Sequence, residues 1–73
     1  ESALENYQQA LRIAVSAYGD DAPYLSEIYY DMGSLCLNSS KFNSAEDYLS
    51  KAVKLNPNSV AAHLRLAELM RVR

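Results

Sequence analysis

Residue types that often reinforce a small protein are scarce in this chain of 73 residues. Cys36 is the only cysteine, so no disulfide can form within the chain, and one cysteine with one histidine, His63, is too few for a structural zinc site. With only two glycines and two prolines, most of the chain can adopt regular structure. The stabilising interactions must therefore come from packed helices, from neighbouring repeats or from self-association.

Long apolar runs are also missing. None approaches the roughly 20 residues that a membrane-spanning helix needs, and no basic segment precedes an apolar one as in a signal peptide. An unpaired thiol without such a signal favours a reducing, cytoplasmic setting. The chain begins with Glu1 rather than Met, which favours a piece cut from a longer protein.

Charge is unevenly distributed along the chain, whose net charge is −2. Residues 1–40 contain six acidic residues and one basic residue, and residues 41–73 contain six basic and three acidic residues. Such polarity can attract copies of the chain head to tail, although chance placement of the chain ends explains it equally well. Arg65 and Arg71 do not share a helix face and the pI is acidic, so we expect no nucleic-acid binding.

Apolar residues recur at steps of three and four throughout, which is the period of one helix face. Gly19 is expected to end the first helix, because glycine adopts a positive φ without a Cβ penalty. Asp20 and Asp21 are expected to cap the second helix, with Pro23 in its first turn. Gly33 falls inside that helix, where glycine is costly, and therefore predicts close approach of another helix.

Two further breaks separate the remaining helices. Residues 38–40 are polar, and Asn56–Pro57 ends the third helical segment. Asn58 or Ser59 can cap the fourth. No segment has the pattern of a strand, and the short connections predict antiparallel neighbours in an all-α fold.

The chain also repeats itself. The spacing of Ala3, Tyr7, Ala10 and Leu11 is the same as that of Ala45, Leu49, Ala52 and Val53, so the first helical segment matches the third. A weaker match relates Tyr29, Met32, Gly33 and Cys36 to His63, Leu66, Ala67 and Met70, at a shorter offset along the chain. Repetition at such periods is typical of stacked helical hairpins.

Residues 26–57 resemble one tetratricopeptide repeat. The features that carry the resemblance are Gly33, the Lys41-Phe42 pair, Ala45, Ala52 and the ending Leu55-Asn56-Pro57, while Cys36 and Leu49 depart from the usual aromatics. The resemblance implies four antiparallel helices in stacked hairpins, an α-solenoid fragment. Residues 1–73 would form a single unit containing the second helix of one repeat (2–18), a full repeat (22–56) and the first helix of the next (59–73).

The segment from Tyr18 to Pro23 adds a detail to this resemblance. It is similar to the Gly-x-Asp-His-Pro connection in the longer repeats of kinesin-light-chain-like adaptors. Ala22 replaces the usual histidine, so only the length class of the repeat is carried over, and no particular cargo.

No residue pattern points to catalysis, a metal or a cofactor. Tyr-Gly-Asp-Asp at residues 18–21 also occurs in metal-binding polymerase hairpins, but here it joins two helices. His63 lacks a nucleophilic partner, and we expect both it and Cys36 to pack rather than react. Of the six tyrosines, we expect four to pack between helices: Tyr7, Tyr18, Tyr29 and Tyr48.

The resemblance implies a non-catalytic module that binds a protein or peptide partner in a concave groove. The groove residues would be Glu27, Tyr30, Ser34, Leu37 and Asn38 from one repeat and Leu64, Arg65, Glu68 and Arg71 from the next. This mixed set favours an internal peptide segment over a carboxyl terminus. The alternative is a self-associating structural element, a homodimer or a head-to-tail assembly.

Overall fold

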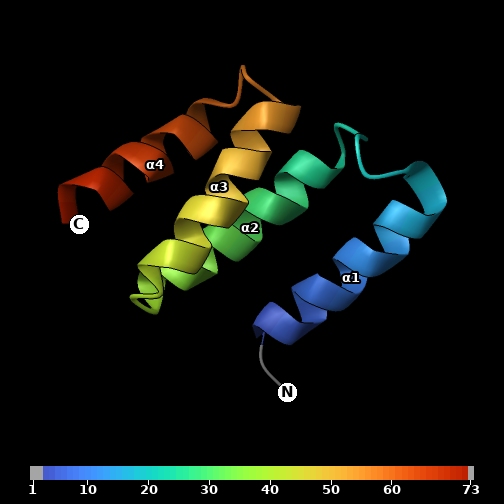
Figure 1. The fold of residues 1–73 in the computed structure, drawn as a ribbon, viewed down its shortest axis with the longest axis horizontal. Helices are drawn as coiled ribbons and strands as arrows, with labels where there is room; N and C mark the ends of the chain where they lie inside the picture. The colour runs from blue at the N-terminus through green and yellow to red at the C-terminus, as the bar shows by residue number, and fades with distance from the viewer. Residues whose placement is uncertain (1–2, 73) are drawn as a thin grey trace.

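The computed structural model describes residues 3–72, and this part of the chain is all helical (Figure 1). The four helices are α1 (Ala3–Tyr18), α2 (Leu25–Asn38), α3 (Phe42–Leu55) and α4 (Val60–Val72), and no strand occurs among these residues. The all-α prediction is confirmed. The expected helix limits at Ser2 and Arg73 lie outside the described residues.

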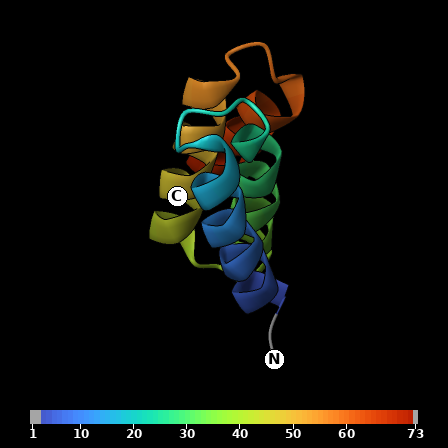
Figure 2. The same cartoon turned by 90° about the vertical axis from the view of Figure 1, so that its right-hand side faces the viewer.

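The hairpin of α2 and α3 forms the centre of the molecule, with α1 on one side and α4 on the other (Figure 1). Consecutive helices run antiparallel, as the short connections predict. α1 lies against α2, whereas α4 lies mainly against α3 and touches α2 at fewer points. The result is a flat plate of 36 × 31 × 15 Å, whose narrow edge appears in Figure 2.

Three helix ends test the sequence-based expectations. Gly19 has a φ of 87° and ends α1, as predicted. Ser59 caps α4, because its Oγ accepts a hydrogen bond from the backbone N–H of Ala62 at 3.3 Å. The expected caps at Asp20 and Asp21 are wrong, since Tyr24 precedes α2 and no side chain caps the helix.

The start of α2 explains that error. The N–H of Leu25 donates to the carbonyl of Ala22, and the N–H of Ser26 donates to that of Pro23. A backbone turn therefore leads into α2, and it satisfies N–H groups that an aspartate would otherwise cap. The two aspartates lie upstream of this turn.

Close packing of α2 on α3 explains the glycine inside α2. A Cβ on Gly33 would stand 2.5 Å from Cγ of Leu49 and 3.3 Å from its backbone nitrogen. Only a residue without a side chain allows α3 to approach so closely, so the prediction of close approach is confirmed. Met32, the preceding residue, is fully buried between the helices.

The tyrosines divide between core and surface. Tyr29 is buried and stacks on Tyr48 with ring centroids 6.4 Å apart, and Tyr7 is half-buried against α2. The expectation that Tyr18 packs between helices is wrong. It is 68% exposed and meets the exposed Tyr24 edge to face, because it ends α1 where no further helix covers it.

Candidate protein-binding surface

One face of α2 carries most of the residues predicted to line a groove. Glu27, Tyr30 and Ser34 follow one another at steps of three and four, so they lie on the same side of the helix. Glu27 is exposed, and Tyr30 and Ser34 are half-buried. Asp31 belongs to the same face, one helical turn after Glu27, and the sequence analysis missed it although the spacing contained the signal.

Tyr30 links this face of α2 to α4. Arg65 of α4 forms an ion pair with Glu68 at 2.8 Å, one helical turn further on. The pKa of the Arg65 guanidinium is raised, first by its interaction with the Tyr30 hydroxyl and then by Glu68. The structure thus brings together Tyr30, Arg65 and Glu68, three of the residues that the sequence places in the groove.

A hollow of about 270 Å³ opens beside Tyr30, where the first turns of α2 and α4 meet. Its walls come from the start of α2, the end of α3 and the start of α4: Pro23, Ser26, Glu27, Tyr30, Asn56, Ser59 and Ala61. Only Glu27 and Tyr30 of this set were predicted. Ala61 follows Glu27 at the same offset at which Ala67 follows Gly33, so the internal sequence repeat could have predicted it.

The α2 side of this surface is acidic. Burial raises the pKa of the Asp31 carboxyl, and the nearby Glu27 carboxylate raises it further. The ion pair of Arg65 with Glu68 involves neither acid, and neither is paired with a base elsewhere in residues 3–72. Two carboxylates on one helix face therefore present unneutralised negative charge beside the hollow.

The other predicted groove residues lie outside the hollow. Leu37 packs partly against the core cluster formed by Cys36, Ala45 and Leu69. Ser34 has a buried Oγ that finds no hydrogen-bond partner within the described part of the chain. The remaining three are exposed along the two helices: Asn38, Leu64 and Arg71.

His63 and Cys36, the two residues weighed for catalysis, lie in different surroundings. His63 is exposed, contrary to the expectation that it packs, and its Nε2 donates to the carbonyl of Pro57 at 2.9 Å, which braces the α3–α4 turn. Cys36 is buried as expected, and burial raises the pKa of its thiol more than the nearby Lys41 lowers it.

Within residues 3–72, no group of side chains is arranged to hold a metal ion. Nor is any helix there both long and apolar enough to cross a membrane.

Antiparallel helices that repeat in sequence and stack side by side define a helical-repeat protein. A family model described as tetratricopeptide repeat matches residues 1–58, and the chain belongs to this family. Comparisons with curated proteins and with solved structures found no match. Tetratricopeptide repeats generally mediate protein–protein interactions and are typically non-catalytic.

Proposed function

We propose that this chain is a non-catalytic module that binds an extended internal segment of a partner protein across α2 and α4. The observation that carries the proposal is the hollow between Tyr30 of α2 and Ala61 of α4. Two helices from successive repeat positions contribute to it, as expected for a surface on which a peptide lies across stacked hairpins.

The walls of the hollow indicate which side chain it accepts. The Pro23 ring, the Tyr30 ring and the Ala61 methyl group are apolar, and polar atoms of Ser26 and Ser59 stand beside them. A small apolar side chain of the ligand fits such a setting. Its burial against the apolar walls is favourable, and the few polar groups fix its orientation.

Charge indicates what the ligand carries next to that side chain. Glu27 and Asp31 are free to pair with a lysine or arginine of the peptide, which would relieve the repulsion between the two carboxylates. A carboxyl terminus is a poorer ligand, since Arg65 already pairs with Glu68. We therefore propose a segment in which a basic residue neighbours an apolar one.

The test is selection of random peptides displayed on phage against the immobilised chain, followed by binding measurements with the purified peptides. Ala61→Gln is the informative variant, because it fills the hollow without adding charge near Glu27. Glutamine is a good helix former, so α4 should still form. Ser50→Gln is the matched control, placed at an exposed position of α3 away from the hollow.

We expect the selected peptides to share a basic residue beside an apolar one. Ala61→Gln should weaken their binding at least about tenfold, because its amide fills the hollow and stands against the apolar side chain of the ligand, and Ser50→Gln should not. Peptides that bind Ala61→Gln as well as the wild type would contradict the proposal. So would ¹⁵N-resolved shifts on binding that avoid Glu27, Tyr30 and Ala61.

A further inference from the structure

A second hollow, of about 210 Å³, opens where the loop between α1 and α2 faces the last turns of α3. We call it the charged hollow, because its walls carry two acids and two bases beside an aromatic and an aliphatic side chain: Asp20, Asp21, Lys51, Lys54, Tyr29 and Leu55. It shares no residue with the hollow beside Tyr30. A ligand in the charged hollow would therefore leave the peptide-binding face free.

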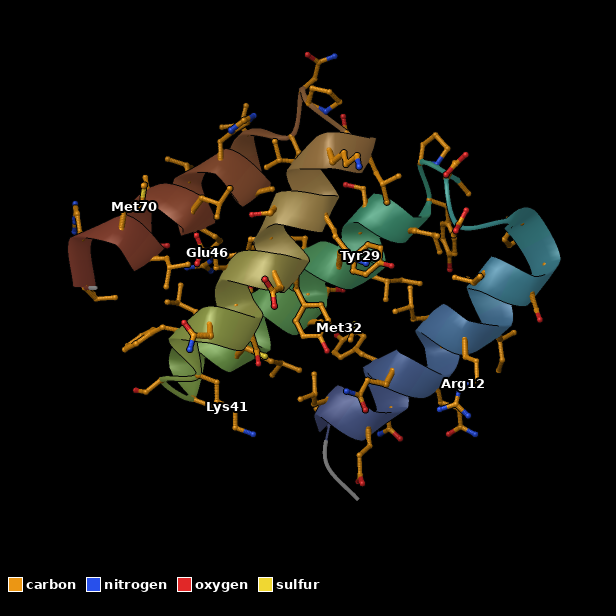
Figure 3. The ribbon with its side chains drawn as sticks, viewed as in Figure 1. Arg12, Tyr29, Met32, Lys41, Glu46 and Met70 are labelled. Carbon is orange, nitrogen blue, oxygen red and sulfur yellow. The ribbon has the colours of Figure 1, made fainter. Side chains whose placement is uncertain are left out.

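An aromatic ring holds Lys51 at one wall of the charged hollow. The Nζ atom of Lys51 lies 5.5 Å from the centroid of the Tyr29 ring, within the range of a cation–π contact. The ring is itself fixed, because it is buried between α1 and α3 (Figure 3) and stacks on Tyr48. Since a cation–π contact does not consume all the N–H donors of an ammonium group, Lys51 can still donate to an anion.

The two aspartates line the same hollow as the lysines without pairing with them. A backbone turn leads into α2, so neither Asp20 nor Asp21 is used as a helix cap. Within residues 3–72, no ion pair joins either carboxylate to Lys51 or Lys54. Opposite charges that stand apart around one hollow can both contact a ligand placed between them.

The mixture of charges restricts what the charged hollow can hold. The two lysines attract an inorganic anion but the two aspartates repel it, and a metal cation meets the reverse situation. A small molecule with both an ammonium group and a carboxylate satisfies both sides, because each of its groups forms charge-assisted hydrogen bonds. The half-buried Leu55 adds an apolar wall, against which a short aliphatic group packs favourably.

We propose that the charged hollow binds a free α-amino acid with a small apolar side chain. The ammonium group of this ligand donates to Asp20 and Asp21. Its carboxylate accepts from Lys51 and Lys54, and its side chain lies against Leu55. The volume of about 210 Å³ is below the roughly 300–1,000 Å³ of sites for drug-sized ligands, which favours so small a molecule. The site is separate from the peptide-binding face and does not depend on it.

Titration of the chain with L-valine, followed by ¹⁵N-resolved NMR, tests the proposal. Valinamide, which lacks the carboxylate, and N-acetylvaline, which lacks the ammonium group, are the matched ligand controls. Lys54→Gln and Asp21→Asn each remove one charge from the charged hollow, and Lys41→Gln and Asp47→Asn remove the same charges away from it. All four positions are exposed, so each variant should fold, which circular dichroism verifies.

We expect valine to shift the amide signals of residues 20–21 and 51–55 until they saturate. Valinamide and N-acetylvaline should bind at least about tenfold more weakly, because each lacks one of the two charge-assisted contacts. Lys54→Gln and Asp21→Asn should weaken valine binding to a similar extent, and the two control variants should bind as the wild type does. The absence of saturable shifts with valine, equal binding of valinamide or N-acetylvaline, or undiminished binding by Lys54→Gln or Asp21→Asn would overturn the proposal.

Discussion

α2 and α4 match weakly in sequence, and their surroundings differ sharply. Gly33 of α2 is buried under Leu49, whereas Ala67, the residue that matches it in α4, is exposed. Cys36 is 1% exposed, whereas its counterpart Met70 is 78% exposed. Gly33 and Ala67 are both small, and Cys36 and Met70 are both apolar, so the difference at these positions comes from the neighbours: within residues 3–72, α2 has a helix on each side and α4 does not.

The comparison teaches where the stability and the binding capacity of this fold reside. In a stacked array each helix is stabilised by its neighbours rather than by its own sequence. Within residues 3–72, the buried residues gather in the hairpin of α2 and α3, while α1 and α4 each expose large apolar side chains, such as Ile13 and Met70.

The largest expected effect compares the two methionines. Met32 is fully buried in α2, and Met70 is mostly exposed in α4. Met32→Ala should lower the free energy of unfolding by about 2–5 kcal/mol through lost burial and the cavity left behind. The same change at Met70 should cost less than about 0.5 kcal/mol. Urea denaturation at low protein concentration measures both changes in the free energy of unfolding. Equal losses would contradict the distinction between a buried Met32 and an exposed Met70.

The next effect concerns added bulk at equivalent positions. Gly33→Ala gains helix propensity, but its Cβ would collide with Leu49, so we expect a net loss of about 1–2 kcal/mol from overpacking. Ala67→Leu adds more bulk on α4 and should change stability by less than about 0.5 kcal/mol. Thermal unfolding of both variants checks the pair. A stabilised Gly33→Ala would show that α3 need not approach α2 so closely.

Helix capping gives a smaller contrast, because a side chain caps the start of α4 and none caps the start of α2. Ser59→Ala removes the hydrogen bond to Ala62 and should cost about 1 kcal/mol. Tyr24→Ala at the start of α2 should cost less than about 0.5 kcal/mol, since no side-chain cap is lost there. Chemical denaturation of the two variants decides the matter, and a costlier Tyr24→Ala would contradict the assignment of the caps.

The smallest effect depends on pH and is confined to α2. The pKa of Asp31 is raised above its ordinary value of 3.8, so the folded chain holds this proton more tightly than the unfolded chain does. Ionised Asp31 therefore lowers stability at neutral pH, and the penalty fades as pH falls through the folded pKa toward 3.8. Asp31→Asn should be more stable than the wild type at neutral pH and indistinguishable below 3.8. Denaturant midpoints across pH measure this, and a constant difference would refute it.

Much of the fold could be predicted because its signals are local. Helical periodicity indicated four helices, Gly19 marked the end of α1, and Gly33 predicted the close contact with α3. The start of α2 was misjudged, since a backbone turn takes the role assigned to Asp20 and Asp21. Local sequence does not distinguish a side-chain cap from a backbone turn with the same polar composition.

Burial near the ends was harder to predict than helix position. Tyr18 and His63 were expected to pack, yet both are exposed, because their burial depends on neighbouring helices that a local pattern does not reveal. In the candidate site, the family pattern brought Tyr30 and Arg65 into one group. It missed Asp31, which lies one helical turn after Glu27, and Ala61, which follows Glu27 at the offset of the internal sequence repeat.

The central claim is that, within residues 3–72, α2 belongs to a complete hairpin while one side of α4 is uncovered. Amide hydrogen exchange followed by NMR at low protein concentration tests it most directly, since protection reports local opening. The account predicts the slowest exchange in the middle of α2 and α3 and much faster exchange throughout α4. Protection of α4 equal to that of α2 in the dilute chain would contradict it.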